Sequence, residues 1–262
     1  MNSDSDLNQP IPIKKINGVK YIPFMNKEPL TPFTAFWRYS IGERIASRID
    51  CNRLGKFLLS KKEEVLSIKD KLQDGGTGLG PNSTTARWAS YNVLNWRWES
   101  EDVKILEEEI IKTHDLYYTQ MLGEKPPMIT VLACWMNIMK KGERIKKHNH
   151  SSYEMGYLSG NFTVACDDSK TIYIQPYIHF TEKELLERVE DWGYDHTEDY
   201  YASINTPGNI SLFPSYIPHF TTEHKTDTDR ITIAFELSPT ELTINQYNNV
   251  LMNRSHQHLT AI

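Results

Sequence analysis

The second half of the chain is a series of short segments whose composition favours β-strands. Residues 128–139 are rich in β-branched and aromatic side chains, and similar segments follow at 162–166, 171–175, 210–213 and 230–237. Turn residues such as Asp167-Asp168 and Pro207-Gly208-Asn209 separate them. Because strand side chains alternate between two faces, a set of short strands like this predicts a β-sandwich or barrel.

The first half of the chain has a different pattern. Apolar residues recur at roughly helical spacing from Arg38 to about Lys71, which predicts a helix there. A second helix is predicted to begin after Ser100, a good N-cap, and to end at Leu122-Gly123. Val19–Phe24 is predicted to be a first strand. We therefore expect a mainly β fold with flanking helices, preceded by a helical N-terminal region.

Composition limits the classes of partner. The chain has 262 residues and a formal net charge of −5, so no overall basic field supports binding to nucleic acid or to an anionic membrane. Its three cysteines are far apart, which suits a reducing compartment better than a disulfide framework. No apolar run reaches the length of a membrane span, and the polar N-terminus does not resemble a signal peptide. We expect a soluble, cytoplasmic protein.

One short stretch carries a pattern typical of metal binding. His148 and His150 are separated by a single residue. On a strand, residues two apart point the same way, so both imidazoles would lie on one face. A third ligand from elsewhere in the chain would complete a facial site of the kind that non-heme iron oxygenases use.

A second stretch supplies candidates for the rest of such a site. In residues 208–220 a turn, a strand and two prolines place His219 on a short rigid segment. Eleven residues later Arg230 opens the last clear strand, with Thr232 on the same face. A guanidinium and a hydroxyl that share a strand face suit the capture of a carboxylate.

These stretches resemble a family of 2-oxoglutarate/Fe(II) oxygenases of bacteria and phages, which are relatives of the prolyl 4-hydroxylases. The resemblance extends from about Trp88 to Leu237, and its matching segments are Trp135-Met136-Asn137, His148-Asn149-His150, Leu158-Ser159-Gly160, Phe213-Pro214-Ser215, His219 and Arg230-Ile231-Thr232. It implies a double-stranded β-helix, a jelly-roll barrel, in which His148, His150 and His219 hold iron. It also implies that Arg230, helped by Thr232, pairs with the far carboxylate of 2-oxoglutarate and that Asn137 lies near this cosubstrate.

The second metal ligand leaves alternatives open. The wider superfamily has Asp or Glu where His150 stands, so a histidine makes the site more positive by one charge. His150 would otherwise stand behind the ligands while Glu154 provides a carboxylate, or the site would be degenerate. The cupins, which share the barrel, have a glycine, His-x-His and Glu at the spacing of Gly142, His148, His150 and Glu154.

The resemblance implies a 2-oxoglutarate- and Fe(II)-dependent dioxygenase that uses O2, releases succinate and CO2 and hydroxylates a C–H bond. A cupin-type dioxygenase or isomerase and a non-catalytic metal-binding barrel are the alternatives. We expect a small-molecule or peptide substrate, no membrane association, and a homodimer as one possible assembly. The expected organisation is a disordered N-terminus, a helical region packing on the barrel, the catalytic barrel and a C-terminal tail, at 1–12, 13–127, 128–240 and 241–262.

Overall fold

The structure is a computed structural model. It describes residues 12–25, 38–69, 76–150, 157–176, 180–192, 196–197, 199–241 and 260–261. The expected disordered N-terminus, most of the C-terminal tail and the alternative ligand Glu154 lie outside the described residues.

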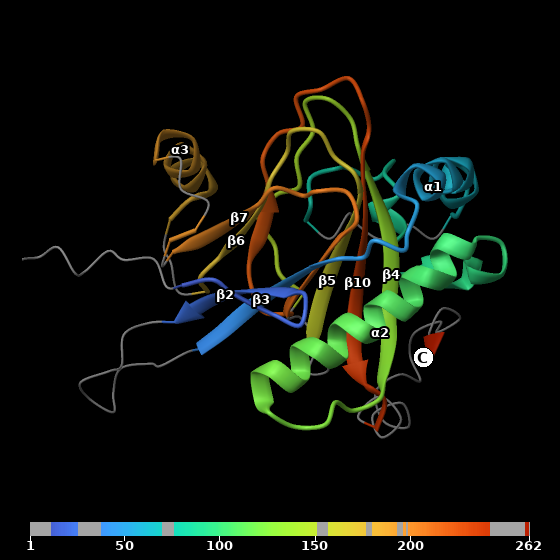
Figure 1. Ribbon diagram of the computed structural model, residues 1–262. Helices are drawn as coiled ribbons and strands as arrows, with labels where there is room; N and C mark the ends of the chain where they lie inside the picture. Colours follow the sequence, from blue (N-terminus) through green and yellow to red (C-terminus); the bar gives the residue numbers. More distant parts are fainter. Residues whose placement is uncertain are drawn as a thin grey trace, which may run out of the picture.

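The centre of the molecule is a large antiparallel sheet in the order β1-β2-β3-β8-β5-β10-β4-β11 (Figure 1). Its strands are β1 (Lys14–Ile16), β2 (Val19–Met25), β3 (Arg38–Ile45), β4 (Ile129–Met139), β5 (Leu158–Ala165), β8 (Asn209–Pro214), β10 (Arg230–Pro239) and β11 (Thr260–Ala261). β10 lies between β4 and β5 and pairs with both along its length. The strands expected from alternating side chains therefore form the middle of the sheet.

A smaller sheet lies against one face of the large one. It contains β6 (Thr171–Ile174), β7 (Tyr200–Ser203) and β9 (His219–Thr221), in the order β7-β6-β9. The Tyr173 ring meets the Phe213 ring of β8 at a centroid distance of 4.9 Å. On the same face, Arg230 of β10 donates from Nη2 to Thr171 Oγ1 at 3.3 Å. The space between the two sheets is therefore lined by both.

Helices cover the opposite face of the large sheet. α1 (Cys51–Leu66) and α2 (Glu101–Leu122) lie on this side, and α2 crosses the strands in Figure 1. Two 3₁₀ helices, η2 (Thr85–Arg87) and η3 (Val93–Trp98), precede α2, and α3 (Glu182–Trp192) lies beside the small sheet. As predicted, α2 begins at its N-cap Ser100, which accepts from the Val103 amide, and it ends at Gly123, whose φ of 71° suits a residue without a side chain.

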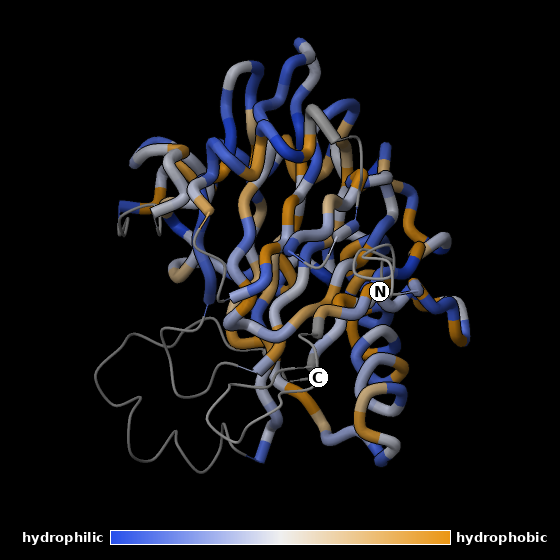
Figure 2. Tube along the Cα trace, turned by 90° about the vertical axis from the view of Figure 1, so that its left-hand side faces the viewer, coloured by the Kyte–Doolittle hydropathy of each residue, from blue (hydrophilic) through white to orange (hydrophobic). Residues whose placement is uncertain are grey.

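Alternation along β10 separates the two faces of the sheet. Ile231, Ile233 and Phe235 belong to the apolar core that the helices share. Full burial of each such side chain stabilises the fold by about 1.5–3 kcal/mol. The Phe235 ring lies so close to Gly160 that a Cβ there would come within 2.1 Å of it. In Figure 2 the most hydrophobic segments run through the interior, whereas the loops at the upper end are hydrophilic.

Parts of the expected secondary structure are wrong. The helix predicted from Arg38 begins only at Cys51, because residues 38–45 form β3 and pair with β2 and β8. Trp96 is buried, whereas Trp98 is 83% exposed. α3 opens with a capping box, in which Thr181 and Glu184 exchange hydrogen bonds. None of the helices in the described ranges combines the length and the apolar character that crossing a membrane requires.

Candidate metal centre and cosubstrate cavity

Backbone pairing brings the predicted histidines together. The amide of His148 donates to the His219 carbonyl at 3.0 Å, and the amide of His219 donates back to the His148 carbonyl at 2.9 Å. Two residues on, the His150 amide donates to the Ser215 carbonyl at 2.9 Å. A local antiparallel bridge therefore fixes the His-x-His segment beside the segment between β8 and β9.

The three imidazoles meet at one point. The ring centroids of His148 and His219 are 4.3 Å apart, and those of His150 lie 5.3 and 5.1 Å from these two rings. One nitrogen of each residue lies within 4.8 Å of one nitrogen of the others. Three imidazole nitrogens at this separation suit a single transition-metal ion.

Neighbouring carbonyls orient two of these rings. His148 Nδ1 lies 2.8 Å from the Lys146 carbonyl oxygen, and His219 Nδ1 lies 3.1 Å from the Ile217 carbonyl oxygen. A carbonyl oxygen only accepts, so Nδ1 carries the proton in both rings. Their Nε2 lone pairs are therefore the ones available to a metal.

Burial keeps the His148 and His219 side chains neutral. It lowers the pKa of His148 to about 4, and the neighbouring His150 adds to this effect. Burial also places the pKa of His219 well below its ordinary value, with further lowering from His148 and His150. Neutral imidazole is the form that binds metal, so the cluster is competent for coordination near pH 7.

Arg230 lies at the other end of the cavity that the histidines line. Its side chain is 1% exposed, and its guanidinium donates from Nη1 to the Met139 sulfur at 3.2 Å, besides its bond to Thr171. Its Nε has no hydrogen-bond partner among the described residues, and no carboxylate in them lies within ion-pair distance. Burial lowers its pKa from the ordinary value. The site therefore holds a buried cation with unused donor capacity.

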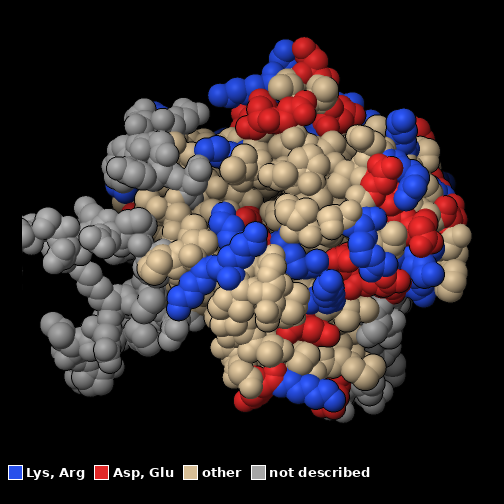
Figure 3. Space-filling view, viewed as in Figure 1, with Lys and Arg blue, Asp and Glu red and all other residues tan. Residues whose placement is uncertain are grey.

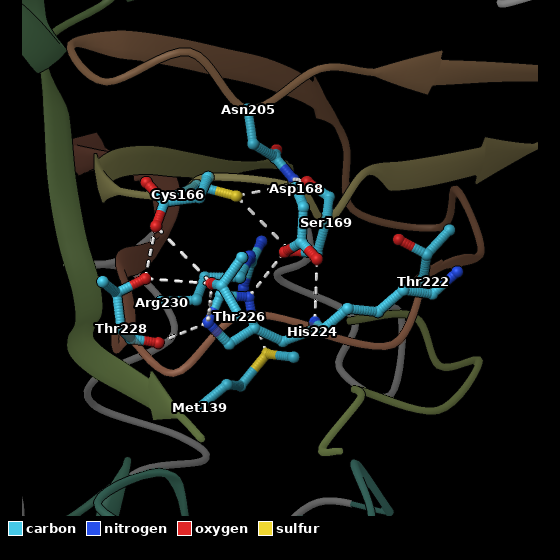
Figure 4. Close-up of polar contacts among 12 residues, drawn as sticks. Met139, Cys166, Asp168, Ser169, Asn205, Thr222, His224, Thr226, Thr228 and Arg230 are labelled. Atoms are coloured by element: carbon cyan, nitrogen blue, oxygen red, sulfur yellow. Dashed lines mark hydrogen bonds and ion pairs between the residues drawn. The ribbon is translucent and has the colours of Figure 1, made fainter. Parts of the chain in front are cut away.

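Figure 4 shows the polar residues around Arg230, with Met139 and Cys166 beside it. It also shows His224, which is fully buried and whose Nδ1 lies 2.9 Å from Asp168 Oδ1. His224 is not among the residues that line the cavity.

Thr232 and Asn137 also line the cavity, as neighbours across the β10–β4 pair. The Thr232 hydroxyl is buried without a hydrogen-bond partner in the described residues. The side-chain oxygen of Asn137, Oδ1, accepts hydrogen bonds from Thr85 Oγ1 at 2.6 Å and from Trp135 Nε1 at 3.1 Å. These two bonds fix the side-chain amide, so its NH2 group is the part left for a ligand.

Sequence reasoning missed the cavity residues that come from the small sheet and from one loop. Thr171, Tyr173, Thr221 and Thr77 all line the space. Tyr173 is fully buried, and its ring lies 5.8 Å from that of His219. No local pattern marks these positions, because only the packing of the two sheets brings them to the site.

The outer surface beside the cavity has no field of one sign. At the upper end of the molecule, lysines and acidic residues alternate on the face shown in Figure 3. Lys140 pairs with Asp229 and Lys141 pairs with Asp227 across the loops before β10. These pairs neutralise one another, so this end does not form a basic patch for nucleic acid.

Comparison with known proteins identifies the class. Residues 133–236, which contain all six predicted site residues, match the family described as "Putative 2OG-Fe(II) oxygenase". This segment, about two fifths of the chain, is therefore similar to the 2OG-Fe(II) oxygenases. No curated protein matches the sequence.

Solved structures of low similarity accompany this match. One is an oxidoreductase of the 2OG-Fe(II) oxygenase family from Burkholderia pseudomallei, with 12% identity, a TM-score of 0.39 and coverage of 53% of this chain and 59% of that one. HygX from Streptomyces hygroscopicus with nickel and 2-oxoglutarate has 16% identity, a TM-score of 0.30 and coverage of 44% and 59%. A Pseudomonas putida prolyl-4-hydroxylase has 11% identity, a TM-score of 0.36 and coverage of 53% and 66%. The chain thus spans about three fifths of the first of these proteins.

Proposed function

We propose that the protein is a 2-oxoglutarate- and Fe(II)-dependent dioxygenase that hydroxylates a C–H bond and releases succinate and CO2. One observation carries the proposal. A single cavity is lined at one end by three histidines with converging nitrogens and at the other by a buried arginine that lacks a carboxylate partner among the described residues. The first group suits a metal cation and the second a dianionic cosubstrate.

The histidines fit Fe(II). We assign His148, His150 and His219 as its three protein ligands, because neutral imidazole is a good donor for iron and three ligands leave positions open for a cosubstrate and O2. When bound, Fe(II) would activate O2, which is the oxidant, and 2-oxoglutarate would supply two of the four electrons that reduce it, the C–H bond of the substrate supplying the other two. The chain's own contribution is to fix the donor nitrogens through the backbone bridge and the carbonyls that hold Nδ1.

Arg230 fits the far carboxylate of 2-oxoglutarate. Its buried Nε and the unpartnered Thr232 hydroxyl are the donors that an incoming carboxylate would satisfy. A carboxylate would also neutralise a buried charge, so this contact combines hydrogen bonding with electrostatic attraction. Asn137 offers its amide NH2 from the adjacent strand, and the apolar rings of Trp135 and Phe213 exclude water from the same space.

The two facing sheets support a double-stranded β-helix as the finer description of the fold. We propose residues 128–240 as its catalytic core and residues 13–127 as the region packed on it. β3 lies in the same large sheet as the core strands, so the N-terminal region contributes to the framework as well as covering it.

A substrate would have to reach the cavity that the histidines and Arg230 line. We propose a small molecule or a peptide side chain as substrate, and a homodimer as one assembly to test. The free Cys51, Cys134 and Cys166 support a cytoplasmic location.

The test is turnover of 2-oxoglutarate in air with Fe(II) and ascorbate. Many such sites consume the cosubstrate slowly without a substrate, so succinate is measured with and without a library of candidate substrates. We expect succinate from the wild type and none from His219→Ala. Iron binding without succinate under every condition contradicts the proposal and favours a cupin-type metal protein or a non-catalytic barrel. Loss of iron binding in Glu154→Ala would then favour the cupin-type protein over the non-catalytic barrel, since the cupin pattern requires that carboxylate.

A further inference from the structure

We infer that Glu236 holds His150 in its metal-binding orientation and supplies the negative charge that a three-histidine ligand set lacks. Glu236 is a positioning residue in this account, since it acts through His150 and not on the metal itself. The inference rests on the proposed function, because it takes His150 as a ligand.

The contact between the two side chains is direct. Glu236 Oε1 lies 3.2 Å from His150 Nδ1, and the two side chains are only 15% and 6% exposed. The distance is that of an ion pair, while the alignment falls short of a hydrogen bond. A small rotation of the carboxylate completes the bond. In the described residues, His150 Nδ1 has no other polar partner.

The other two histidines explain why His150 needs such a partner. His148 and His219 each place Nδ1 against the carbonyl of the residue two positions earlier, Lys146 and Ile217. For His150 that residue is His148, whose carbonyl already accepts the His219 amide in the backbone bridge. The His148 carbonyl is thus engaged with the His219 amide, and His150 Nδ1 faces a side chain, not a backbone carbonyl. That side chain is Glu236.

Strand geometry delivers the carboxylate to this position. Arg230, Thr232, Ala234 and Glu236 alternate along β10, so all four share the face of the sheet that lines the cavity. A register irregularity falls between Glu236 and Leu237, and bulges of this kind re-aim side chains near functional sites. One strand therefore carries the cosubstrate contact at its start and the histidine contact six residues later.

Charge gives the contact a second effect. Three imidazoles add no charge, so they leave both positive charges of Fe(II) uncompensated, whereas a carboxylate ligand would remove one. A carboxylate behind His150 raises the basicity of the ring and returns one negative charge to the site without occupying a ligand position. The Trp135 ring lies 5.7 Å from the His150 ring and limits the ring's freedom from another side.

The experiment is an anaerobic titration of apo protein with Co(II), whose visible bands report the metal directly. Glu236→Gln keeps the size of the side chain and removes its charge. We expect the dissociation constant for Co(II) to rise by about 10- to 100-fold, the usual cost of losing a carboxylate behind a metal-bound histidine. Glu107→Gln is the matched control, because Glu107 is also 15% exposed but lies on α2, where it pairs with Arg97 of η3. It should bind Co(II) like the wild type.

A second readout follows the proton itself. In the Co(II) protein, each ligand histidine bound through Nε2 gives one strongly shifted Nδ1–H resonance, and we expect three. Glu236→Ala should lose or broaden one of them through faster exchange with water, while the other two, held by carbonyls, persist. A merely structural role for Glu236 would not remove one signal selectively.

The outcomes separate this inference from the proposed function. If the wild type fails to bind Co(II), or binds it equally well after His148→Ala and His219→Ala, the proposed function itself is wrong. If those histidines are required but Glu236→Gln binds as tightly as Glu107→Gln and Glu236→Ala keeps all three resonances, only the role of Glu236 is overturned.

Discussion

Two buried arginines and two sets of buried histidines on opposite faces of the large sheet differ in their partners. On the helical face, Arg44 and His114 both have partners. Arg44 of β3 pairs with Glu109 of α2, both less than 9% exposed, and the fully buried His114 has Asp115 Oδ1 at 3.0 Å and Tyr157 OH at 3.1 Å on its two ring nitrogens. On the cavity face, Arg230 has no carboxylate partner in the described residues, and three histidine nitrogens face one another.

The difference shows which groups belong to the scaffold. A buried charge or donor costs free energy unless it is paired, so a fold that leaves several unpaired in one cavity must gain from something that binds there. Arg44 and His114 are satisfied by other residues of the scaffold. We propose that a cation at one end and an anion at the other complete the cavity face.

The largest effect should come from removing a histidine of the cavity. His219→Ala deletes one of the three converging donors, and the affinity for Fe(II) or Co(II) should fall by more than about 100-fold, beyond the usual cost of losing a residue behind a ligand. His114→Gln, which changes an equally buried histidine of the scaffold, should leave metal affinity unchanged. Metal titration with both variants checks this. An equal loss of metal affinity in the two variants would contradict the assignment of His219 to the metal site and His114 to the scaffold.

The two buried arginines should respond oppositely to the same substitution. Arg44→Met leaves Glu109 buried, with only the more distant and more exposed Arg48 near it, and should lower the free energy of unfolding by about 3–5 kcal/mol. Arg230→Met removes a buried charge that lacks a carboxylate partner, and should leave the apo protein unchanged or more stable by about 1–4 kcal/mol. Urea unfolding without ligands measures both. A large destabilisation by Arg230→Met would mean that Arg230 is a scaffold residue.

Arg230→Met should still weaken binding of 2-oxoglutarate. Hydrogen bonds to a charged group contribute about 1.5–3 kcal/mol, so the dissociation constant should rise by about 10- to 100-fold. Affinity for the metal alone should be unaffected, because Arg230 does not contact the histidines. Calorimetric titration of the Ni(II) protein with 2-oxoglutarate tests the first expectation and Ni(II) titration the second.

The smallest effect is a pH dependence that belongs to the scaffold. Burial lowers the pKa of His114 in the folded state, against the opposing effect of Asp115. The unfolded chain therefore binds more protons below about pH 6.5, and the contribution of His114 to stability, complete above that pH, falls as the pH is lowered. His114→Gln should unfold with a shallower dependence on pH between 7.5 and 5.5 than the wild type. An unchanged slope would show that the pKa of His114 is the same in the folded and unfolded states.

Local patterns in the sequence predicted much of the site. The spacing of His148, His150 and His219 and the alternation from Arg230 pointed to one face of a β-fold, and the structure brings these residues to one cavity. Their roles as ligands remain a prediction. The helix 101–122 was predictable because its N-cap and its terminal glycine are local signals.

The missed features depend on contacts that are distant in sequence. The helix predicted from Arg38 to about Lys71 rests on apolar residues such as Ile45 and Ile49 at helical spacing, yet pairing with β8 makes residues 38–45 a strand. Tyr173 and Thr171 reach the cavity only because the small sheet folds over the large one. The role inferred for Glu236 depends on its contact with His150, and 85 residues separate the two in the chain.

The most direct test of the central claim is optical. Under anaerobic conditions, apo protein is loaded with Fe(II) and then titrated with 2-oxoglutarate. Because the cosubstrate chelates the metal only if both ends of the cavity bind their groups, a metal-to-ligand charge-transfer band should appear in the visible region. It should be absent from His219→Ala and require more 2-oxoglutarate in Arg230→Met. Fe(II) binding with no band at any concentration of 2-oxoglutarate would contradict the account.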